Sequence, residues 1–377
     1  MSHHNFSSYY ALLNILLIFS RKEKQRPNRT NVTTSSIFGF DLSFDLKKEF
    51  PLFEGRFTSL RNVAFELAWF LEGSTNADRL KEYGCNIWNE WALQEDFTDS
   101  IKMSPHERVQ YLSAISDKSV PEIVRYLQSL KSEEDGHLYL DSLNVPRFMD
   151  FKLVDKGSIG PLYGQQWRAW HSFATDRHGN TKRASVDQIS KLITDLRNNP
   201  YSRRHVISAW NPAFLPDESL SPEENVKLGK MSIAPCHQMS QFYVSDDGDD
   251  SYLDLKVTMR SSDVILGLPY NIASYALLVH LLANEVGLKP GILIMSLGDA
   301  HLYKNHQDVA SELLKRYAEH PEKSDTKLVN FSTDMKISDF MTPMQPVDVV
   351  KEKISKLVTG LSNYNPLPAI KDIPIAI

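Results

Sequence analysis

Hydrophobic residues recur at helical spacing in several parts of the chain. Residues 59–73 carry apolar side chains in the i, i+3, i+4, i+7 pattern of a helix with one buried face, and Gly73 can end that helix. Residues 275–286 are strongly apolar and predict a second helix, ended by Gly287. Residues 11–19 form an apolar run that is too short to span a bilayer and has no small-residue cleavage site after it. We expect a first helix there that packs on the core; the alternative is a disordered leader.

Other segments have the alternating pattern of strands. Residues 252–260 alternate strictly between apolar and polar side chains, which predicts a half-buried strand, and residues 205–210 are rich in β-forming residues. Residues 185–198 are amphipathic with helical period, and Ser185 with Gln188 forms a possible capping box at the start. Helices and strands intermix without regular βαβ alternation. The sequence therefore predicts an α+β fold around a large mixed sheet.

Two polar segments interrupt this pattern. Residues 93–156 are rich in Asp, Glu, Ser and Lys, with a helical piece at 120–130, and predict an inserted helical lobe. Residues 212–230 are rich in Pro, Glu and Ser and predict a surface loop. We expect residues 1–377 to form a single domain that carries the lobe at about 93–156.

Composition narrows the class of protein. Of 377 residues 42% are hydrophobic and 24% charged, as in soluble globular proteins, and two cysteines are too few for a disulfide framework. We therefore expect a reducing compartment, the cytoplasm. No Cys or His spacing suggests zinc, so no metal is expected. The net charge of −5 argues against nucleic acid as substrate and against a membrane surface, so an anionic ligand needs a local arginine cluster.

Two features carry candidate chemistry. In the run Ala234-Pro-Cys-His-Gln238 a thiol adjoins an imidazole, and a neighbouring cationic or basic group helps to form the reactive thiolate. Ordinary packing is the alternative for such a pair. Glu66 lies on the apolar stripe of the helix at 59–73, where burial raises a carboxyl pKa and suits it to proton transfer. The alternative is a structural carboxylate that caps a buried backbone group.

Seven motifs in order resemble the thymidylate synthase family, which also contains pyrimidine-nucleotide hydroxymethylases of phages. The resemblance runs from Arg29 to Ile377. The motifs are Phe65-Glu-Leu-Ala-Trp-Phe-Leu71, Asn86-Ile-Trp-Asn-Glu-Trp-Ala92, Gly160-Pro-Leu-Tyr-Gly-Gln-Gln-Trp-Arg-Ala-Trp170, Ser202-Arg-Arg, Ala234-Pro-Cys-His, Arg260-Ser-Ser-Asp-Val-Ile-Leu-Gly-Leu-Pro-Tyr-Asn271 and Gly298-Asp-Ala-His-Leu-Tyr303.

The resemblance implies one-carbon transfer from 5,10-methylenetetrahydrofolate to C5 of dUMP. Cys236 would add to C6 of the pyrimidine and make C5 nucleophilic. Tyr163 would take part in removing the C5 proton, Glu66 would organise proton transfer, His237 would support the nucleophile, and Trp88 would pack near the transferred carbon.

The resemblance also implies how both ligands are held. Asn271 would read the base, because an amide matches O4 and N3–H of uracil and the cytosine-using relatives favour aspartate there. Asp263, Trp88 and the C-terminal Ile377 would bind or enclose the folate, and His301 and Tyr303 the sugar. Phosphate would be bound by Arg29, Arg203, Arg204, Arg260 and Ser261. The family's arginine pair comes from the partner subunit, so Arg203 and Arg204 imply a homodimer formed through the sheet.

Four departures from the family pattern matter, and three of them, the lost glycines, Asn89 and Met259, favour a hydroxymethylase. Its final step would add water and give 5-hydroxymethyl-dUMP, whereas the alternative, thymidylate synthase, reduces the same intermediate to dTMP and yields dihydrofolate. The retained Trp88 and the C-terminal run at 373–377 favour that alternative. A remote alternative is a non-catalytic nucleotide-binding relative. The departures are Arg29-Thr-Asn-Val-Thr33 without the usual glycines, Glu54-Gly55-Arg56 in place of Thr-Thr-Lys, Asn89 in place of Asp, and Met259 in place of Gln.

Overall fold

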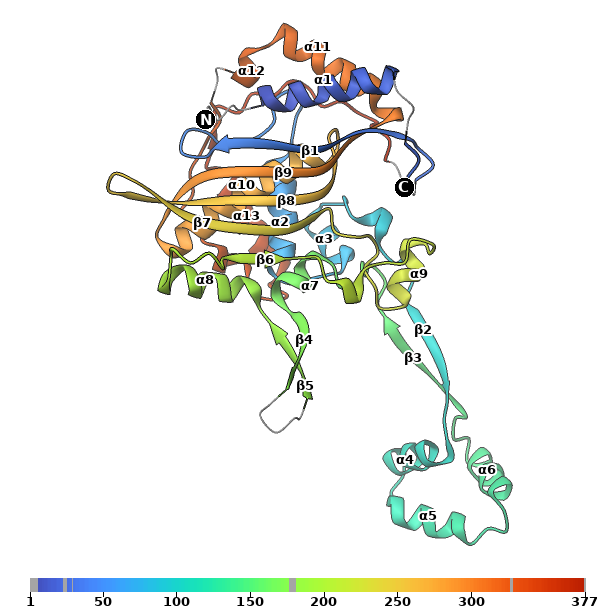
Figure 1. The fold of residues 1–377 in the computed structure, drawn as a ribbon. Coiled ribbons are helices and arrows are strands. Elements are labelled where there is room, and N and C mark those ends of the chain that lie inside the picture. The colour runs from blue at the N-terminus through green and yellow to red at the C-terminus, as the bar shows by residue number, and fades with distance from the viewer. Residues whose placement is uncertain (1–5, 23–25, 29, 176–180, 326–327, 376–377) are drawn as a thin grey trace. The chain divides into compact units, whose positions relative to one another are not determined.

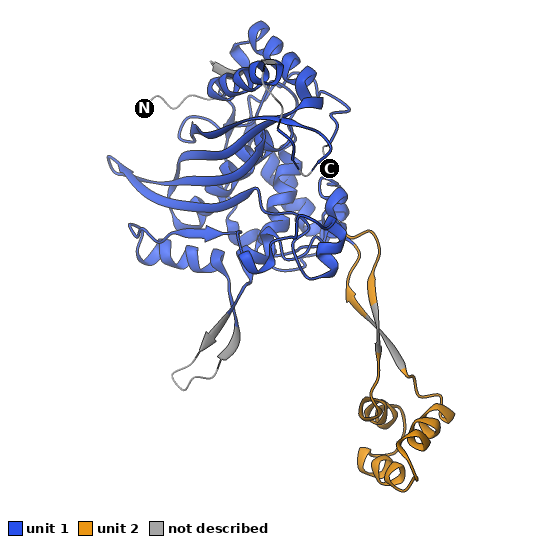
Figure 2. Cartoon of the chain, turned by 45° about the vertical axis from the view of Figure 1, so that its right-hand side comes forward, with its two compact units in different colours: residues 1–92, 157–377 blue, residues 93–156 orange. Residues whose placement is uncertain are grey.

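A computed structural model describes residues 6–22, 26–28, 30–175, 181–325 and 328–375. The chain divides into two compact units, one made of Met1–Ala92 with Gly157–Ile377 and the other of Leu93–Lys156 (Figure 2). The second unit coincides with the polar segment of the sequence. That both belong to one catalytic domain stays a prediction.

A five-stranded mixed sheet organises the first unit (Figure 1). Its order is β1-β9-β8-β7-β6, and only the β8–β9 pair is parallel. The predicted α+β class with a large mixed sheet is thereby confirmed. The strands are β1 (Thr34–Asp45), β9 (Lys289–Tyr303), β8 (Asp250–Asp263), β7 (His237–Asp247) and β6 (Val206–Ser208).

The predicted alternation is visible in β8. Leu253, Leu255, Val257 and Met259 are all buried, while Lys256 and Arg260 are exposed. Burying every second side chain removes apolar surface from water on one face only, which fixes the register of the strand. β6 is shorter than the segment 205–210 predicted from composition.

Two long helices pack beside the sheet. α10 (Gly267–Val286) contacts β8, β9 and α2 (Leu60–Leu71). The side chain of Ser59 caps α2 by accepting the N–H of Asn62 at 3.2 Å, and Gly287 ends α10 with φ +75°. Both predicted helices are confirmed, and α10 begins earlier than the sequence indicated.

The apolar run near the N-terminus forms α1 (Ser7–Lys22). This helix packs on β1 and on α11 (Gln307–Glu319), and Leu12, Leu13 and Leu16 are completely buried (Figure 1). The expected first helix is therefore confirmed, and the alternative of a disordered leader is wrong for these residues. Among the described residues, no helix has both the length and the apolar character to cross a membrane.

The start of α8 (Gln188–Asn198) differs from the prediction. Asp187 is the N-cap, and its Oδ1 accepts the N–H of Ser190 at 3.0 Å. Ser185 instead belongs to β5 (Thr181–Val186), paired with β4 (Trp170–Thr175). The predicted capping box is wrong because strand pairing extends the chain up to the N-cap.

The remaining elements of the first unit connect the sheet and the long helices. The segment 212–230, predicted as a loop, contains η2 (Pro212–Phe214) and α9 (Pro222–Lys227). The others are α3 (Ala77–Tyr83), η1 (Asn89–Trp91), α7 (Tyr163–Arg168), η3 (Lys304–His306), α12 (Glu322–Asp325), β10 (Asn330–Phe331), η4 (Ile337–Phe340), α13 (Val347–Val358) and β11 (Leu361–Ser362).

The second unit consists of two antiparallel strands with three helices between them in the chain. Its strands are β2 (Phe97–Lys102) and β3 (Phe148–Val154), and its helices are α4 (Pro105–Ile115), α5 (Val120–Gln128) and α6 (Glu133–Ser142). The helix predicted at 120–130 is confirmed as α5. Arg108 is 1% exposed and donates to the carbonyl of Val145 at 3.1 Å, so a buried cation helps to hold this small unit together.

Candidate active site

Cys236 lies in the turn immediately before β7 and is partly buried. Its backbone is held from two sides: its N–H donates to the hydroxyl oxygen of Tyr163 at 2.8 Å, and its carbonyl accepts the N–H of Arg260 at 2.7 Å. The Arg260 side chain donates to the carbonyls of Pro235 and Ala234, each at 3.2 Å. The turn that presents the thiol is thus fixed by α7 and β8.

Tyr163 and His237 form a stacked pair beside the cysteine. Their ring centroids are 3.9 Å apart and the planes differ by 7°. On its other side His237 shares a 2.6 Å hydrogen bond, through Nδ1, with the hydroxyl of Tyr275. Burial lowers the pKa of His237 to about 3, so this imidazole is neutral near pH 7. Burial, with the nearby Cys236, raises the pKa of Tyr163 well above its ordinary value.

Glu66 is buried on α2 and has one specific partner. Its Oε1 accepts the indole N–H of Trp88 at 2.8 Å. Burial raises the pKa of Glu66 to about 7, while the hydrogen bond from Trp88 acts in the opposite direction. The ring of Trp88 lies 5.8 Å from that of Tyr163. A carboxyl that exchanges a proton near neutral pH therefore joins the same group of contacts as Cys236.

A second group of predicted site residues lies where β8 and β9 end. Asp263 pairs with His301 across the two parallel strands, and its Oδ1 accepts the N–H groups of Ile265 and Leu266 at 2.9 and 3.2 Å. The rings of His301 and Tyr303 are 5.1 Å apart. Burial opposes protonation of His301, but Asp299, 3.5 Å away, and Asp263 outweigh it, so the pKa of His301 is raised. This group is polar and charged, unlike the aromatic surroundings of Cys236.

The remaining residues predicted for the site were not placed in either of these two groups. Ser261 follows Arg260 on β8, and Asn271 lies near the start of α10, both partly buried. Arg203 and Arg204 are exposed in the turn before β6, and the structure, within its described part, gives their side chains no hydrogen bond or ion pair to Cys236. Arg29 and Ile377 lie outside the described residues.

Three residues near these groups were not singled out from the sequence. Tyr275 was only one position in an apolar helix, and periodicity cannot show that its hydroxyl meets His237. The indole N–H of Trp91 is buried and has no hydrogen-bond partner among the described residues, and its ring lies 5.7 Å from that of Trp88. His306 is 0% exposed. It lies three residues after Tyr303, where the last family motif ends, so the motif did not include it.

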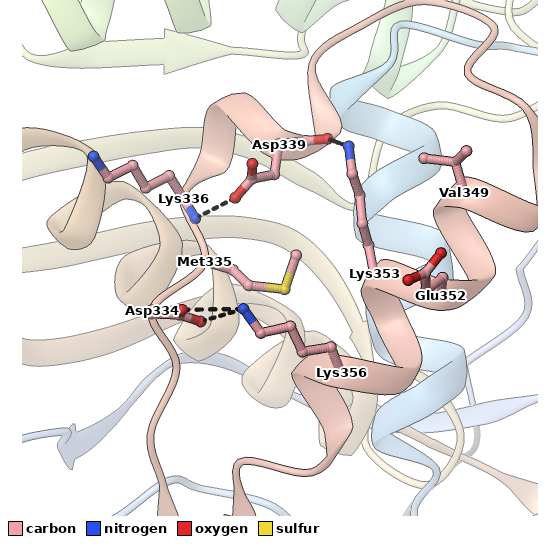
Figure 3. A pocket seen from close by; sticks show the side chains of 8 residues that line it. All are labelled: Asp334, Met335, Lys336, Asp339, Val349, Glu352, Lys353 and Lys356. Atoms are coloured by element: carbon pink, nitrogen blue, oxygen red, sulfur yellow. Dashed lines mark hydrogen bonds and ion pairs between the residues drawn. The ribbon is translucent and has the colours of Figure 1, made fainter.

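A hollow between α13 and the segment around η4 contains none of these residues (Figure 3). Two of its lysines already have partners: Lys356 pairs with Asp334 at 3.0 Å, and Lys353 donates to the carbonyl of Asp339 at 2.5 Å. We assign it no role. Within the described residues, no three His, Cys, Asp or Glu side chains cluster so that they could hold a metal ion.

Comparison with known proteins gives one consistent result. The sequence model of the family described as thymidylate synthase matches residues 8–373. The thymidylate synthase of Staphylococcus haemolyticus is 34% identical over 98% of both chains, and that of Listeria monocytogenes is 34% identical over 94% of this chain and 95% of the relative. The thymidylate synthase of Mycoplasma genitalium is 35% identical over 82% of this chain and 88% of its own. This chain belongs to the thymidylate synthase family.

Proposed function

We propose that the protein transfers a one-carbon unit to C5 of dUMP and completes the reaction by reduction, forming dTMP. The observation that carries the proposal is the group of contacts around Cys236, in a chain similar to proteins named thymidylate synthase along nearly its whole length. The thiol lies on a fixed turn that is bonded to a protonated phenol, and a carboxyl with a pKa of about 7 is linked to that phenol through Trp88. This arrangement suits addition to a pyrimidine followed by proton transfer.

In the proposed mechanism the sulfur of Cys236 forms a bond to C6 of the uracil, and the displaced electron pair makes C5 nucleophilic. After C5 has formed its new carbon–carbon bond, loss of its proton by way of Tyr163 would break the bond between the transferred carbon and the folate nitrogen. The C6–sulfur bond would break, releasing Cys236, once the transferred carbon has gained hydride. Glu66 holds and passes protons near the pyrimidine, supported by the indole of Trp88. His237 is neutral and acts as a stacking and hydrogen-bonding support for Tyr163.

The residues present fit a bound folate. Methylenetetrahydrofolate supplies the one-carbon unit and, in the reductive path, the hydride. Asp263 offers a carboxylate held in place by two backbone N–H groups, which suits the N–H donors of a pterin ring. The buried indole N–H of Trp91 is an unused donor next to Trp88. We assign Asp263, Trp88 and Ile377 to the folate.

The nucleotide is proposed to be dUMP rather than dCMP. Asn271 reads the base, because its amide can both donate to O4 and accept from N3–H of uracil. His301 and Tyr303 hold the sugar. The phosphate is bound by Arg29, Arg203, Arg204, Arg260 and Ser261.

We further propose a homodimer formed through the sheet, in which Arg203 and Arg204 complete the partner's site. Their exposure at the edge strand, outside the contacts around Cys236, supports this arrangement. So do the exposed Met239 and Tyr243 on β7, because apolar groups on a sheet face favour a partner surface. Mixing Cys236→Ala chains with Arg203→Ala/Arg204→Ala chains should then recover activity, up to about one quarter of wild type, from hybrid dimers with one intact site. No recovery would contradict the shared site.

The hydroxymethylase prediction is the second candidate. Its main support was Asn89 and Met259, where an acidic residue and an amide of the family pattern are lost. The matched relatives are named thymidylate synthase. Their names favour the reductive final step. The count of two cysteines, too few for a disulfide framework, supports the proposed cytoplasmic location.

Mass spectrometry of the nucleotide product is the decisive experiment. The purified protein is given dUMP and methylenetetrahydrofolate, and we expect dTMP to form in step with dihydrofolate. A product heavier by one oxygen, formed without dihydrofolate, would establish the hydroxymethylase instead. Absence of tritium release from 5-labelled dUMP would reject both, and faster release from 5-labelled dCMP would overturn the base assignment.

A further inference from the structure

The C-terminal segment, residues 364–375, is held by Glu54, which departs from the family pattern, and by Arg316. The N–H of Asn365 donates to the carboxylate of Glu54 at 2.5 Å, and Glu54 is 2% exposed. Arg316 donates to the carbonyl of Pro368 at 2.8 Å. A buried carboxylate that accepts a backbone N–H is costly to separate from it. The segment is therefore anchored in its first half before it runs on toward the chain end.

His306 holds the other end of this segment. It is the last residue of η3, is 0% exposed, and forms a 2.7 Å hydrogen bond through Nε2 to the carbonyl of Pro374. A carbonyl only accepts, so Nε2 carries a proton. Nδ1 faces Asp263, with 3.8 Å between Nδ1 and Oδ1, and has no hydrogen-bond partner among the described residues. One buried ring thus touches the C-terminal segment and approaches a carboxylate.

Asp263 is itself held in a fixed position. Its Oδ1 accepts from Ile265 and Leu266, and the N–H of the intervening Val264 donates to the carbonyl of His301 at 3.1 Å. With the carboxylate immobile, a displacement of His306 changes its surroundings directly.

We propose that His306 is a positioning residue that couples the seating of the C-terminal segment to Asp263, and through it to folate binding. This rests on the proposed function, which assigns Asp263 to the folate. Removing the Nε2 donor frees the carbonyl of Pro374, so the end of the segment dissociates more often and Asp263 loses its neighbour.

The first test needs no catalysis. Unliganded full-length protein is digested with a carboxypeptidase, and release of the last residues is timed. His306→Leu and His306→Asn, which lack a donor at the Nε2 position, should release them about three- to tenfold faster, as expected for loss of one hydrogen bond. His306→Gln keeps a donor there and should resemble wild type, as should His320→Leu, which changes an exposed histidine after α11. Melting curves establish that each variant is folded.

Steady-state kinetics give the second readout. The donor-lacking variants should raise the KM for the folate about three- to tenfold and leave the KM for dUMP within about twofold, with His306→Gln restoring both. Wild-type digestion rates in both donor-lacking variants would overturn the inference. So would equal changes in the two KM values, or a Gln variant that behaves like Leu, because these indicate a merely structural histidine. Should wild type lack turnover, the proposed function fails while the digestion experiment still decides whether His306 holds the segment.

Discussion

Two buried histidines show opposite electrostatic behaviour in this protein. His237 stacks on Tyr163 among aromatic rings, and burial lowers its pKa to about 3. His301 is also buried, but Asp299 and Asp263 outweigh the burial and raise its pKa. The comparison teaches that the Cys236 region is governed by exclusion of water, and the region at the ends of β8 and β9 by charge pairing.

This difference changes which neighbouring group can help to form the thiolate of Cys236. The sequence suggested that the adjacent imidazole could help to form the thiolate, but a neutral His237 supplies no positive charge. Arg260 is the cation bound to the same turn, through the carbonyls of Ala234 and Pro235. The imidazole next to Cys236 in sequence serves Tyr163 and Tyr275 instead.

The largest expected effect comes from the proposed nucleophile. Cys236→Ser should lower kcat by about 10³-fold or more, because a hydroxyl ionises far less readily than a thiol near neutral pH. Nucleotide binding, measured by calorimetry, should stay close to wild type. The control is Cys85→Ala: Cys85 is buried and burial raises its thiol pKa to about 11, so turnover should change only slightly. Turnover of Cys236→Ser comparable to wild type would refute the assigned role.

The next largest effect is expected at Glu66, the buried carboxyl group in the region around Cys236. Glu66→Gln keeps an oxygen that can accept from Trp88 but cannot exchange a proton, so kcat should fall about 10²-fold. The pH dependence of kcat near pH 7 should also disappear, since the pKa of Glu66 is about 7. A variant that keeps this pH dependence would assign it to another group. Stopped-assay rates between pH 5.5 and 8.5 provide the measurement.

The same substitution has a stability consequence with a definite sign. The folded pKa of Glu66, about 7, exceeds the ordinary value of 4.5, so unfolding releases a proton between these values. Wild type should lose free energy of unfolding relative to Glu66→Gln as pH rises from 4.5 to 7, by on the order of 3 kcal/mol, and no further above that. Urea denaturation of both proteins at pH 5 and pH 8 measures the difference. If the difference in free energy of unfolding between the two proteins is equal at both pH values, the raised pKa of Glu66 is contradicted.

Substitutions of His301 and His237 should differ in how they change the pH dependence of the KM for dUMP. His301→Gln should raise the KM for dUMP about tenfold, because a charged donor beside the nucleotide is lost. In wild type that KM should rise as pH increases above 6.5 through the raised pKa of His301, and the variant should lose this trend. His237→Gln should keep it, because His237 is uncharged throughout that range. Similar profiles for the two variants would remove the contrast.

The smallest expected effect concerns the support behind His237. Tyr275→Phe removes the hydroxyl that bonds His237 Nδ1 and should cost about 1 kcal/mol of stability and a few-fold in kcat. Thermal unfolding and initial rates measure both. Tyr317→Phe, which changes a partly buried tyrosine stacked on Tyr10 of α1, is a matched control expected to leave kcat unchanged.

The elements with strong local periodicity were predictable. The helix at 59–73 and the strand at 252–260 bury the faces that their patterns indicated, because each pattern needs only the apolar side to face a core. The start of α8 was not predictable, since pairing with β4 decides that Ser185 is extended. The sequence analysis missed the short helices within 212–230, because a segment rich in Pro, Glu and Ser is typical of a surface loop.

The sequence by itself determined the family motifs, the mixed fold and the residues with reactive groups, because these depend on side-chain type and short-range spacing. Only the tertiary structure decided what surrounds each group: that His237 is neutral, that Glu66 has a pKa near 7, and that His306 lies between Pro374 and Asp263. Burial and partners come from segments far apart in the chain, so protonation and positioning are properties of the fold rather than of any local run of residues.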